Sequence, residues 1–227
     1  MKRLALISPP SFPLASALRG LDMTEEVTRL ADLGARAAVI VLFSLMAMRL
    51  GADFLATGRM TGLLLLVSEL LVVVLTVMRR SAAAVDRSIT ARVLTTLSML
   101  GPPLLQPAHV APLAPGTLTV AMSAAGLAVV IAGKITLGRS FGLMPANRGV
   151  VSTGVYRLVR HPIYLGYLVT HVAFLAANPS RWNVLALAIA DAALLARAVC
   201  EEATLARDEQ YRQYQQATRW RVCPGVF

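Results

Sequence analysis

The chain has 227 residues, of which 56% are hydrophobic and 15% charged, and its formal net charge at pH 7 is +10. So large an apolar share excludes an ordinary soluble domain and indicates an integral membrane protein. The basic residues lie between apolar segments rather than along one face, so the charge indicates membrane topology and not nucleic-acid binding. Cys200 and Cys223 are the two cysteines, which excludes a disulfide framework.

Residues 1–26 mix proline, serine and charge, and we expect a flexible or surface-lying N-terminal segment there. A helix needs about 20 apolar residues to cross a bilayer, and six later segments approach that length. We predict an all-α transmembrane bundle of five or six spans with a cytoplasmic cap, in a single domain. Residues 27–115 would hold the N-terminal transmembrane helices. The six segments are 37–48, 61–78, 93–105, 116–137, 163–177 and 182–200.

Several of these segments carry a feature that interrupts their apolar character. The first lies between Arg36 and Arg49, which we expect to extend toward the two interfaces. The second contains Glu69, which needs a buried partner, and Arg49 and Asp191 are candidates by depth. The third ends near Pro102 and Pro103, so it is expected to kink or break. The last two segments are separated by a short polar break and form a helical hairpin, 162–200.

The distribution of Lys and Arg predicts the orientation, because cytoplasmic loops are enriched in positive charge. Four arginines follow the second segment, between residues 79 and 92, and five basic residues crowd 134–160. The connection between the third and fourth segments carries neither Lys nor Arg. This alternation places both termini in the cytoplasm. The expected location is therefore a membrane, and for a bacterial protein the inner membrane.

Two polar patches of the last third are candidates for a ligand site. In the first, Pro162 follows His161 at the start of an apolar segment, where proline suits the first helical turn. The free N–H groups at that helix end can hold an anionic group. In the second patch, Arg197 precedes Glu201 by four residues, on one helical face. The hairpin returns this carboxylate to the side of the membrane on which His161 lies, which offers acidic and basic partners to a sulfonium cofactor.

These motifs resemble the isoprenylcysteine carboxyl methyltransferase family and its relatives, which include phospholipid N-methyltransferases. The resemblance covers residues 116–227 and rests on Arg160-His161-Pro162, on Glu201-Glu202 and on a tyrosine-containing tail that reaches Pro224. It implies that the cofactor is S-adenosylmethionine, with S-adenosylhomocysteine as the product, and that residues 211–224 fold over it as a lid. The cofactor-binding residues that it implies are Tyr156, His161, Pro162, Tyr164, Gly166, Glu202, Tyr211 and Tyr214, and the catalytic ones are Arg160, Arg197 and Glu201.

The implied activity is transfer of a methyl group to a lipid-like or small acceptor, as in protein-S-isoprenylcysteine carboxyl O-methyltransferases. A carboxylate acceptor needs no base, whereas an amine or a thiol needs deprotonation, for which His161 or a glutamate could serve. A phospholipid amine N- or thiol S-methyltransferase is therefore an alternative. A non-enzymatic transporter or assembly protein is a second one, favoured by Glu69 and the Pro102-Pro103 break. The expected partners are the bilayer and the acceptor, and the three histidines show no metal-ligand spacing.

Overall fold

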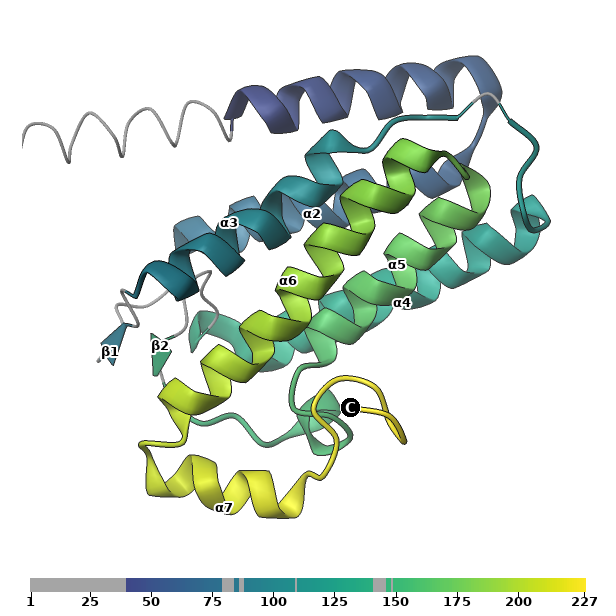
Figure 1. Cartoon of the computed structure of the whole chain (residues 1–227). Helices are drawn as coiled ribbons and strands as arrows, with labels where there is room; N and C mark the ends of the chain where they lie inside the picture. The colour runs from purple at the N-terminus through teal and green to yellow at the C-terminus, as the bar shows by residue number, and fades with distance from the viewer. Residues whose placement is uncertain (1–39, 79–83, 86–87, 109, 141–145, 148) are drawn as a thin grey trace, which may run out of the picture. The chain divides into compact units, whose positions relative to one another are not determined.

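The computed structural model describes residues 40–78, 84–85, 88–108, 110–140, 146–147 and 149–227, and the account below is confined to them. The predicted N-terminal segment 1–26 lies outside these residues. The chain forms two compact units, Met1–Phe43 and Ser44–Phe227, and the candidate site belongs to the second. The described fold is all-α, as predicted, apart from the two-residue strands Ala84–Val85 (β1) and Ala146–Asn147 (β2), which pair antiparallel (Figure 1).

The helices follow the apolar segments of the sequence. Among the described residues, three helices are long and apolar enough to cross a membrane: Ile40–Thr57, Gly116–Leu137 (α4) and Arg181–Leu205 (α6). The chain is an integral membrane protein, and its five or six spans stay a prediction. The other bounds are Met60–Met78 (α2), Ile89–Leu104 (α3), Gly116–Leu137 (α4), Pro162–Ala177 (α5), Arg181–Leu205 (α6) and Glu209–Ala217 (α7), with the short 3₁₀ helices Gly138–Ser140 (η1) and Gly154–Arg157 (η2).

The first helix corrects one expectation, because it continues past Arg49 to Thr57. Arg49 therefore lies within the helix, and its side chain does not extend from a helix end. Its guanidinium donates hydrogen bonds to the carbonyl oxygens of Leu45 and Pro103. The helix ends where Gly58 takes a φ of 70°, a left-handed conformation that favours glycine.

The prolines of α3 lie at its end, where the sequence predicted a kink or a break. Pro102 and Pro103 lie in the last turn of α3, and the helix continues through them to Leu104. The start of α6 holds this end in place, since the Trp182 indole donates to the Leu104 carbonyl oxygen at 2.7 Å. The side-chain amide of Asn183 accepts a hydrogen bond from the Gln106 N–H at 3.0 Å and donates to its carbonyl oxygen at 2.8 Å.

Two glycine contacts bring helix backbones together. A Cβ atom on Gly166 of α5 would lie 2.7 Å from the Gly126 carbonyl oxygen of α4, which is closer than real Cβ contacts. A Cβ atom on Gly101 of α3 would lie 2.2 Å from the Cβ atom of Ala190 in α6. We call these contacts the α4–α5 seam and the α3–α6 seam. Small residues of this kind let membrane helices approach closely.

The α4–α5 seam makes Gly166→Ala destabilising, because the added methyl group must displace a backbone. We expect a loss of about 1–3 kcal/mol, the usual cost of overpacking, seen as a lower thermal-unfolding temperature in detergent micelles. The matched control is Gly116→Ala at the start of α4, whose added Cβ atom meets nothing within 4 Å. Equal unfolding temperatures for the two variants would contradict the seam.

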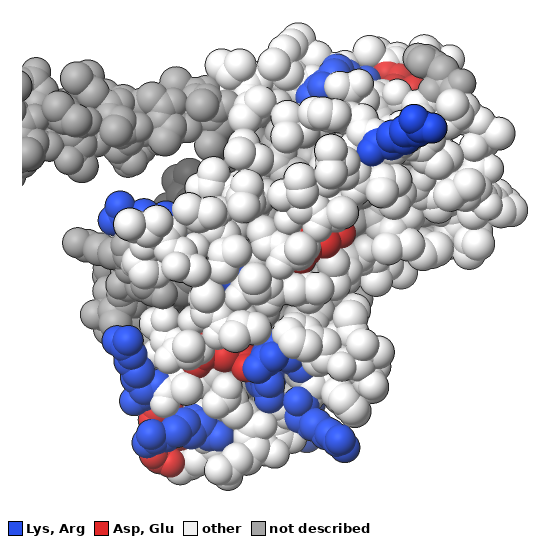
Figure 2. All heavy atoms as spheres, viewed as in Figure 1, with Lys and Arg blue, Asp and Glu red and all other residues white. Residues whose placement is uncertain are grey.

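The outer surface agrees with a membrane setting. Large apolar side chains are exposed along α6, among them Val184, Leu185 and Ile189. Figure 2 shows the surface of the helices mostly without charge, whereas Lys and Arg gather at the end that carries α7, with further basic side chains at the opposite end. At this end α5 begins and α6 ends, and α7 lies across it (Figure 1). We call it the α7 end of the bundle.

Candidate functional site

The start of α5 is fixed by the last residues of the chain. His161 is the N-cap of α5 and Pro162 occupies its first turn, which costs no helical hydrogen bond. The His161 N–H donates to the Arg221 carbonyl oxygen at 2.8 Å, and the Arg160 N–H donates to that of Trp220 at 2.9 Å. The C-terminal segment, residues 206–227, is thereby attached to the beginning of α5.

Glu202 fastens the same segment through its side chain. Its carboxylate accepts hydrogen bonds from Arg160 Nε at 2.7 Å, from Arg221 Nε at 2.9 Å and from Gln215 Nε2 at 3.3 Å. His161 Nε2 lies 3.2 Å from the same carboxylate. Glu202 is 3% exposed. It therefore acts as the anchor that joins α5, α6 and the C-terminal segment.

Glu201 faces a different set of partners, because consecutive helical residues point about 100° apart. Its carboxylate accepts a hydrogen bond from the Tyr164 hydroxyl at 2.7 Å and one from Arg197 at 3.1 Å. His161 Nδ1 lies 3.6 Å from it. The Arg197 guanidinium also lies over the Tyr164 ring, 5.5 Å from its centre. The two carboxylates therefore have different roles: Glu202 holds the C-terminal segment, and Glu201 faces a cavity.

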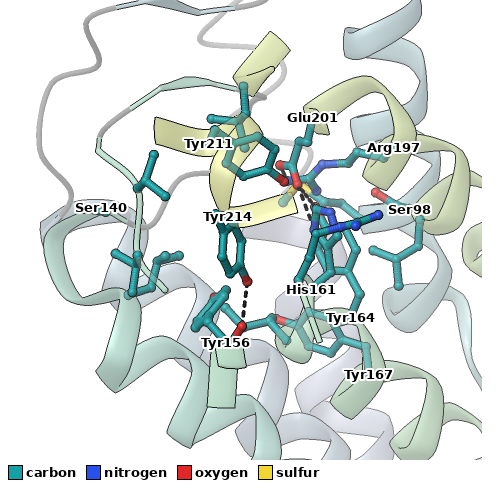
Figure 3. Close-up of a pocket in the computed structure, with 18 of the residues that line it drawn as sticks. Ser98, Ser140, Tyr156, His161, Tyr164, Tyr167, Arg197, Glu201, Tyr211 and Tyr214 are labelled. Atoms are coloured by element: carbon teal, nitrogen blue, oxygen red, sulfur yellow. Dashed lines mark hydrogen bonds and ion pairs between the residues drawn. The ribbon is translucent and has the colours of Figure 1, made fainter. Parts of the chain in front are cut away.

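This cavity has about 1220 Å³ of empty volume, counted with the solvent at its mouth. Side chains from α5, α6 and α7 converge on it (Figure 3). At the α7 end the wall contains Tyr156, Glu201, Tyr211 and Tyr214. We call the opposite end, inside the bundle, the inner end; its wall contains Glu69, Ser98, Met99, Pro102, Tyr167 and His171.

Three tyrosines pack together at the α7 end. The Tyr214 hydroxyl donates to the Tyr156 carbonyl oxygen at 2.7 Å, and the Tyr211 and Tyr214 rings meet edge to face at 5.6 Å. Burial raises the pKa of Tyr214 to about 12 and raises the pKa of Tyr156 and Tyr211 as well. All three phenols are therefore neutral at physiological pH and present aromatic faces and hydroxyl donors.

The raised pKa of Tyr214 predicts an alkaline loss of stability. An unfolded tyrosine ionises near 10, whereas the folded phenol keeps its proton until about 12. The stabilisation by the neutral phenol is complete below pH 10 and is lost as pH rises through 12. Thermal unfolding followed between pH 9 and 12 is the measurement. Tyr214→Phe should flatten this decline, and an unchanged slope in that variant would contradict the assignment.

Eight of the eleven predicted site residues lie on the cavity wall: Tyr156, Arg160, His161, Tyr164, Arg197, Glu201, Tyr211 and Tyr214. The other three are not among its lining residues. Gly166 faces α4 in the seam, and Pro162 packs toward α4 near Gly133, 3.6 Å from where a Cβ atom there would be. Glu202 points at Arg160 and Arg221. In this structure these three residues position the wall rather than form it.

The sequence prediction missed part of the wall on α5. Tyr164, Tyr167 and His171 are spaced by three and four residues, so they lie on one helical face, and this spacing could have revealed the additional pair. His171 pairs with Asp191 of α6 at 2.6 Å. Glu69 lies within electrostatic reach of His171 and Lys134. Its candidate partners have other contacts, since Arg49 donates to the Pro103 carbonyl oxygen and Asp191 pairs with His171.

The match to known proteins covers the same region. Residues 117–207 match the isoprenylcysteine carboxyl methyltransferase (ICMT) family. The match includes α4, α5 and α6, and with them His161, Arg197 and Glu201. Members of the ICMT family are membrane methyltransferases that generally use S-adenosylmethionine. No curated protein matches the chain.

Proposed function

We propose that the chain is an integral membrane methyltransferase that uses S-adenosylmethionine and transfers its methyl group to a lipid-like or small acceptor. One observation carries the proposal. The cavity brings a buried guanidinium and a carboxylate of the region that matches the ICMT family to one place with a group of aromatic faces, two of which, Tyr211 and Tyr214, lie beyond that region. These are the three kinds of partner that an amino acid joined to a nucleoside through a sulfonium needs.

The fit to the cofactor rests first on Arg197. Its Nε is buried and has no hydrogen-bond partner among the described residues, although its terminal nitrogen pairs with Glu201. An unpaired guanidinium N–H inside a protein is costly, and a ligand carboxylate would satisfy it. Glu201, on the same wall, would accept hydrogen bonds from the ligand's amino group or ribose.

The tyrosines supply the remaining contacts. An aromatic face attracts a cation, including a sulfonium, because its π electrons are negative. Tyr156, Tyr211 and Tyr214 would hold the nucleoside and the charged sulfur between them, and α7 would close the cavity from water. When bound, S-adenosylmethionine supplies the activated methyl group. The protein's part is to orient the two reactants and to exclude water.

The membrane orientation follows from the charges at the α7 end. The arginines of this end include Arg160, Arg212, Arg219 and Arg221, and positive charge favours the cytoplasmic side. We infer that both termini are cytoplasmic and that the polar cofactor enters from there. A lipid-like acceptor would enter from the bilayer. In a bacterium the membrane would be the inner one.

Calorimetric titration of the full chain in detergent micelles with S-adenosylhomocysteine tests the proposal. We expect saturable one-to-one binding. We expect this binding to weaken in Tyr164→Phe, which removes the hydroxyl group that donates a hydrogen bond to Glu201. The rival function, a non-enzymatic transporter or assembly protein, predicts no binding. Radiolabelled S-adenosylmethionine then separates the acceptors, because a methyl ester releases methanol in base, whereas N- and S-methyl products do not.

A further inference from the structure

The inner end of the cavity has no role in the contacts assigned to the cofactor. His171 lies nine residues beyond Pro162 along α5, roughly 14 Å at the helical rise of 1.5 Å per residue. Asp191 precedes Glu201 by ten residues along α6, roughly 15 Å by the same measure. The inner end is therefore inside the apolar bundle, where ionisable side chains are costly and commonly serve a function.

His171 offers one unused nitrogen to this space. Its Nδ1 lies 2.6 Å from Asp191 Oδ1, and against a carboxylate this nitrogen must carry the hydrogen. The neutral ring then has a lone pair on Nε2. This Nε2 is buried and has no hydrogen-bond partner among the described residues, while the ring is 3% exposed and lines the cavity. It is suited to accept a hydrogen bond from a ligand N–H.

The acidic side chains around the inner end favour a ligand with N–H groups. Glu69, 6% exposed, lines the cavity, and Lys134, which is 1% exposed, lies within electrostatic reach of it. Two acidic side chains, Glu69 and Asp191, therefore face one basic side chain, Lys134. Because Asp191 and His171 Nδ1 are engaged with each other, the Glu69 carboxyl group and His171 Nε2 are left as acceptors that face the cavity. A carboxylate ligand would meet another carboxyl group there.

The remaining wall is apolar or weakly polar, with Met99 and Pro102 from α3 and the Tyr167 ring, which stacks with His171 at 6.2 Å. We propose that the inner end binds the amino group of an aliphatic amine, with its N–H directed at His171 Nε2 and its charge facing Glu69. This amine would be the methyl acceptor of the proposed function, on which the inference rests. It would first give one N–H proton to His171 Nε2; its nitrogen lone pair would then form the new C–N bond as the bond between sulfur and methyl breaks, and S-adenosylhomocysteine would leave with the electron pair of that bond. The site thereby favours an amine acceptor over a carboxylate.

Binding without any methyl donor tests the site directly. The full chain, in nanodiscs of phosphatidylcholine, is titrated calorimetrically with hexylamine, hexanoate and 1-hexanol, and empty nanodiscs serve as the blank. Hexylamine should bind at least ~10-fold more tightly than hexanoate, since their head groups differ in charge. Equal binding of the three compounds would overturn the inference, as would tighter binding of hexanoate.

Two variants assign the binding to these side chains. Glu69→Gln and His171→Phe should each raise the dissociation constant of hexylamine at least ~10-fold, the loss of one charge-assisted contact. Asp53→Asn is the control: it also removes one negative charge, but from a carboxylate that pairs with Arg59 outside the cavity. Unfolding temperatures show whether each variant is folded. Undiminished hexylamine binding in folded Glu69→Gln and His171→Phe would refute the site.

Two further titrations separate the possible outcomes. S-adenosylhomocysteine binding without hexylamine binding would overturn the amine site and leave the methyltransferase proposal intact. The reverse result would overturn the methyltransferase proposal and with it the acceptor role of the amine, and would leave the amine-binding site standing. Adding phosphatidylethanolamine to the nanodiscs identifies the source of the amine. If phosphatidylethanolamine competes with hexylamine, the natural amine is a lipid head group. If it does not compete, the natural amine is a small free amine. Both results require that the amine site exists.

Discussion

Glu202→Ala is expected to lower the free energy of unfolding by about 3 kcal/mol, within the range for a buried ion pair that loses one partner. The substitution leaves Arg160 and Arg221 beside an empty position, with side chains that are 11% and 27% exposed. It also removes the acceptor for Gln215. Thermal unfolding in detergent micelles measures the loss. Limited trypsin digestion should then cleave the C-terminal segment much faster than in the unchanged protein.

The control for this variant removes another glutamate that pairs with an arginine. Glu209 pairs with Arg212 on α7, and their side chains are 65% and 54% exposed. Glu209→Ala should therefore cost well under ~1 kcal/mol, as exposed ion pairs do. Glu202→Gln, which keeps one oxygen acceptor, should fall between the two. If Glu202→Ala unfolded at the same temperature as Glu209→Ala, the anchoring role of Glu202 would be wrong.

Arg197→Ala is expected to weaken S-adenosylhomocysteine binding by ~10- to 100-fold, the equivalent of one hydrogen bond between charged groups. Arg197 is 6% exposed and holds Glu201 at 3.1 Å, so the variant loses both the unpaired Nε donor and the partner of the carboxylate. Calorimetric titration gives the dissociation constant. The unfolding temperature, measured in parallel, separates lost binding from lost folding.

Two companion variants sharpen this measurement. Arg197→Lys keeps a cation beside Glu201 but lacks the Nε donor, so it should remain folded and still bind weakly. Arg207→Ala removes an exposed arginine just beyond the end of α6 and should leave binding unchanged. Full affinity in Arg197→Lys would show that the unpaired nitrogen does not hold the ligand.

The sequence predicted the fold well where the apolar pattern is uninterrupted. The span 116–137 agrees with α4 at both ends, and 163–177 misses only Pro162 of α5. Prediction failed where polar residues are satisfied by distant partners. Arg49 looked like an interface residue, but it bonds to the Pro103 carbonyl oxygen 54 residues away, so the first helix passes through it.

The candidate site was predicted as a set of residues, but their division of labour was not. The sequence places Glu201 next to Glu202 but does not show that one carboxylate faces the cavity and the other the C-terminal segment. That difference depends on where α7 and Arg221 lie in the tertiary structure. In the same way Gly166 belongs to a motif in the sequence, while in the fold it allows α4 to approach. The ionisable side chains around the inner end come from four helices, since Glu69, Lys134, His171 and Asp191 lie on α2, α4, α5 and α6.

The two glycine seams also limit how an acceptor can travel. Where Gly126 meets Gly166, and where Gly101 meets Ala190, the chains are too close to admit even one added methyl group without displacement. An alkyl chain is wider than a methyl group, so a lipid-like acceptor does not enter from the bilayer through these contacts. An acceptor that reaches the inner end must therefore pass between other helices or beside the C-terminal segment. The two seams would stay closed while it does so.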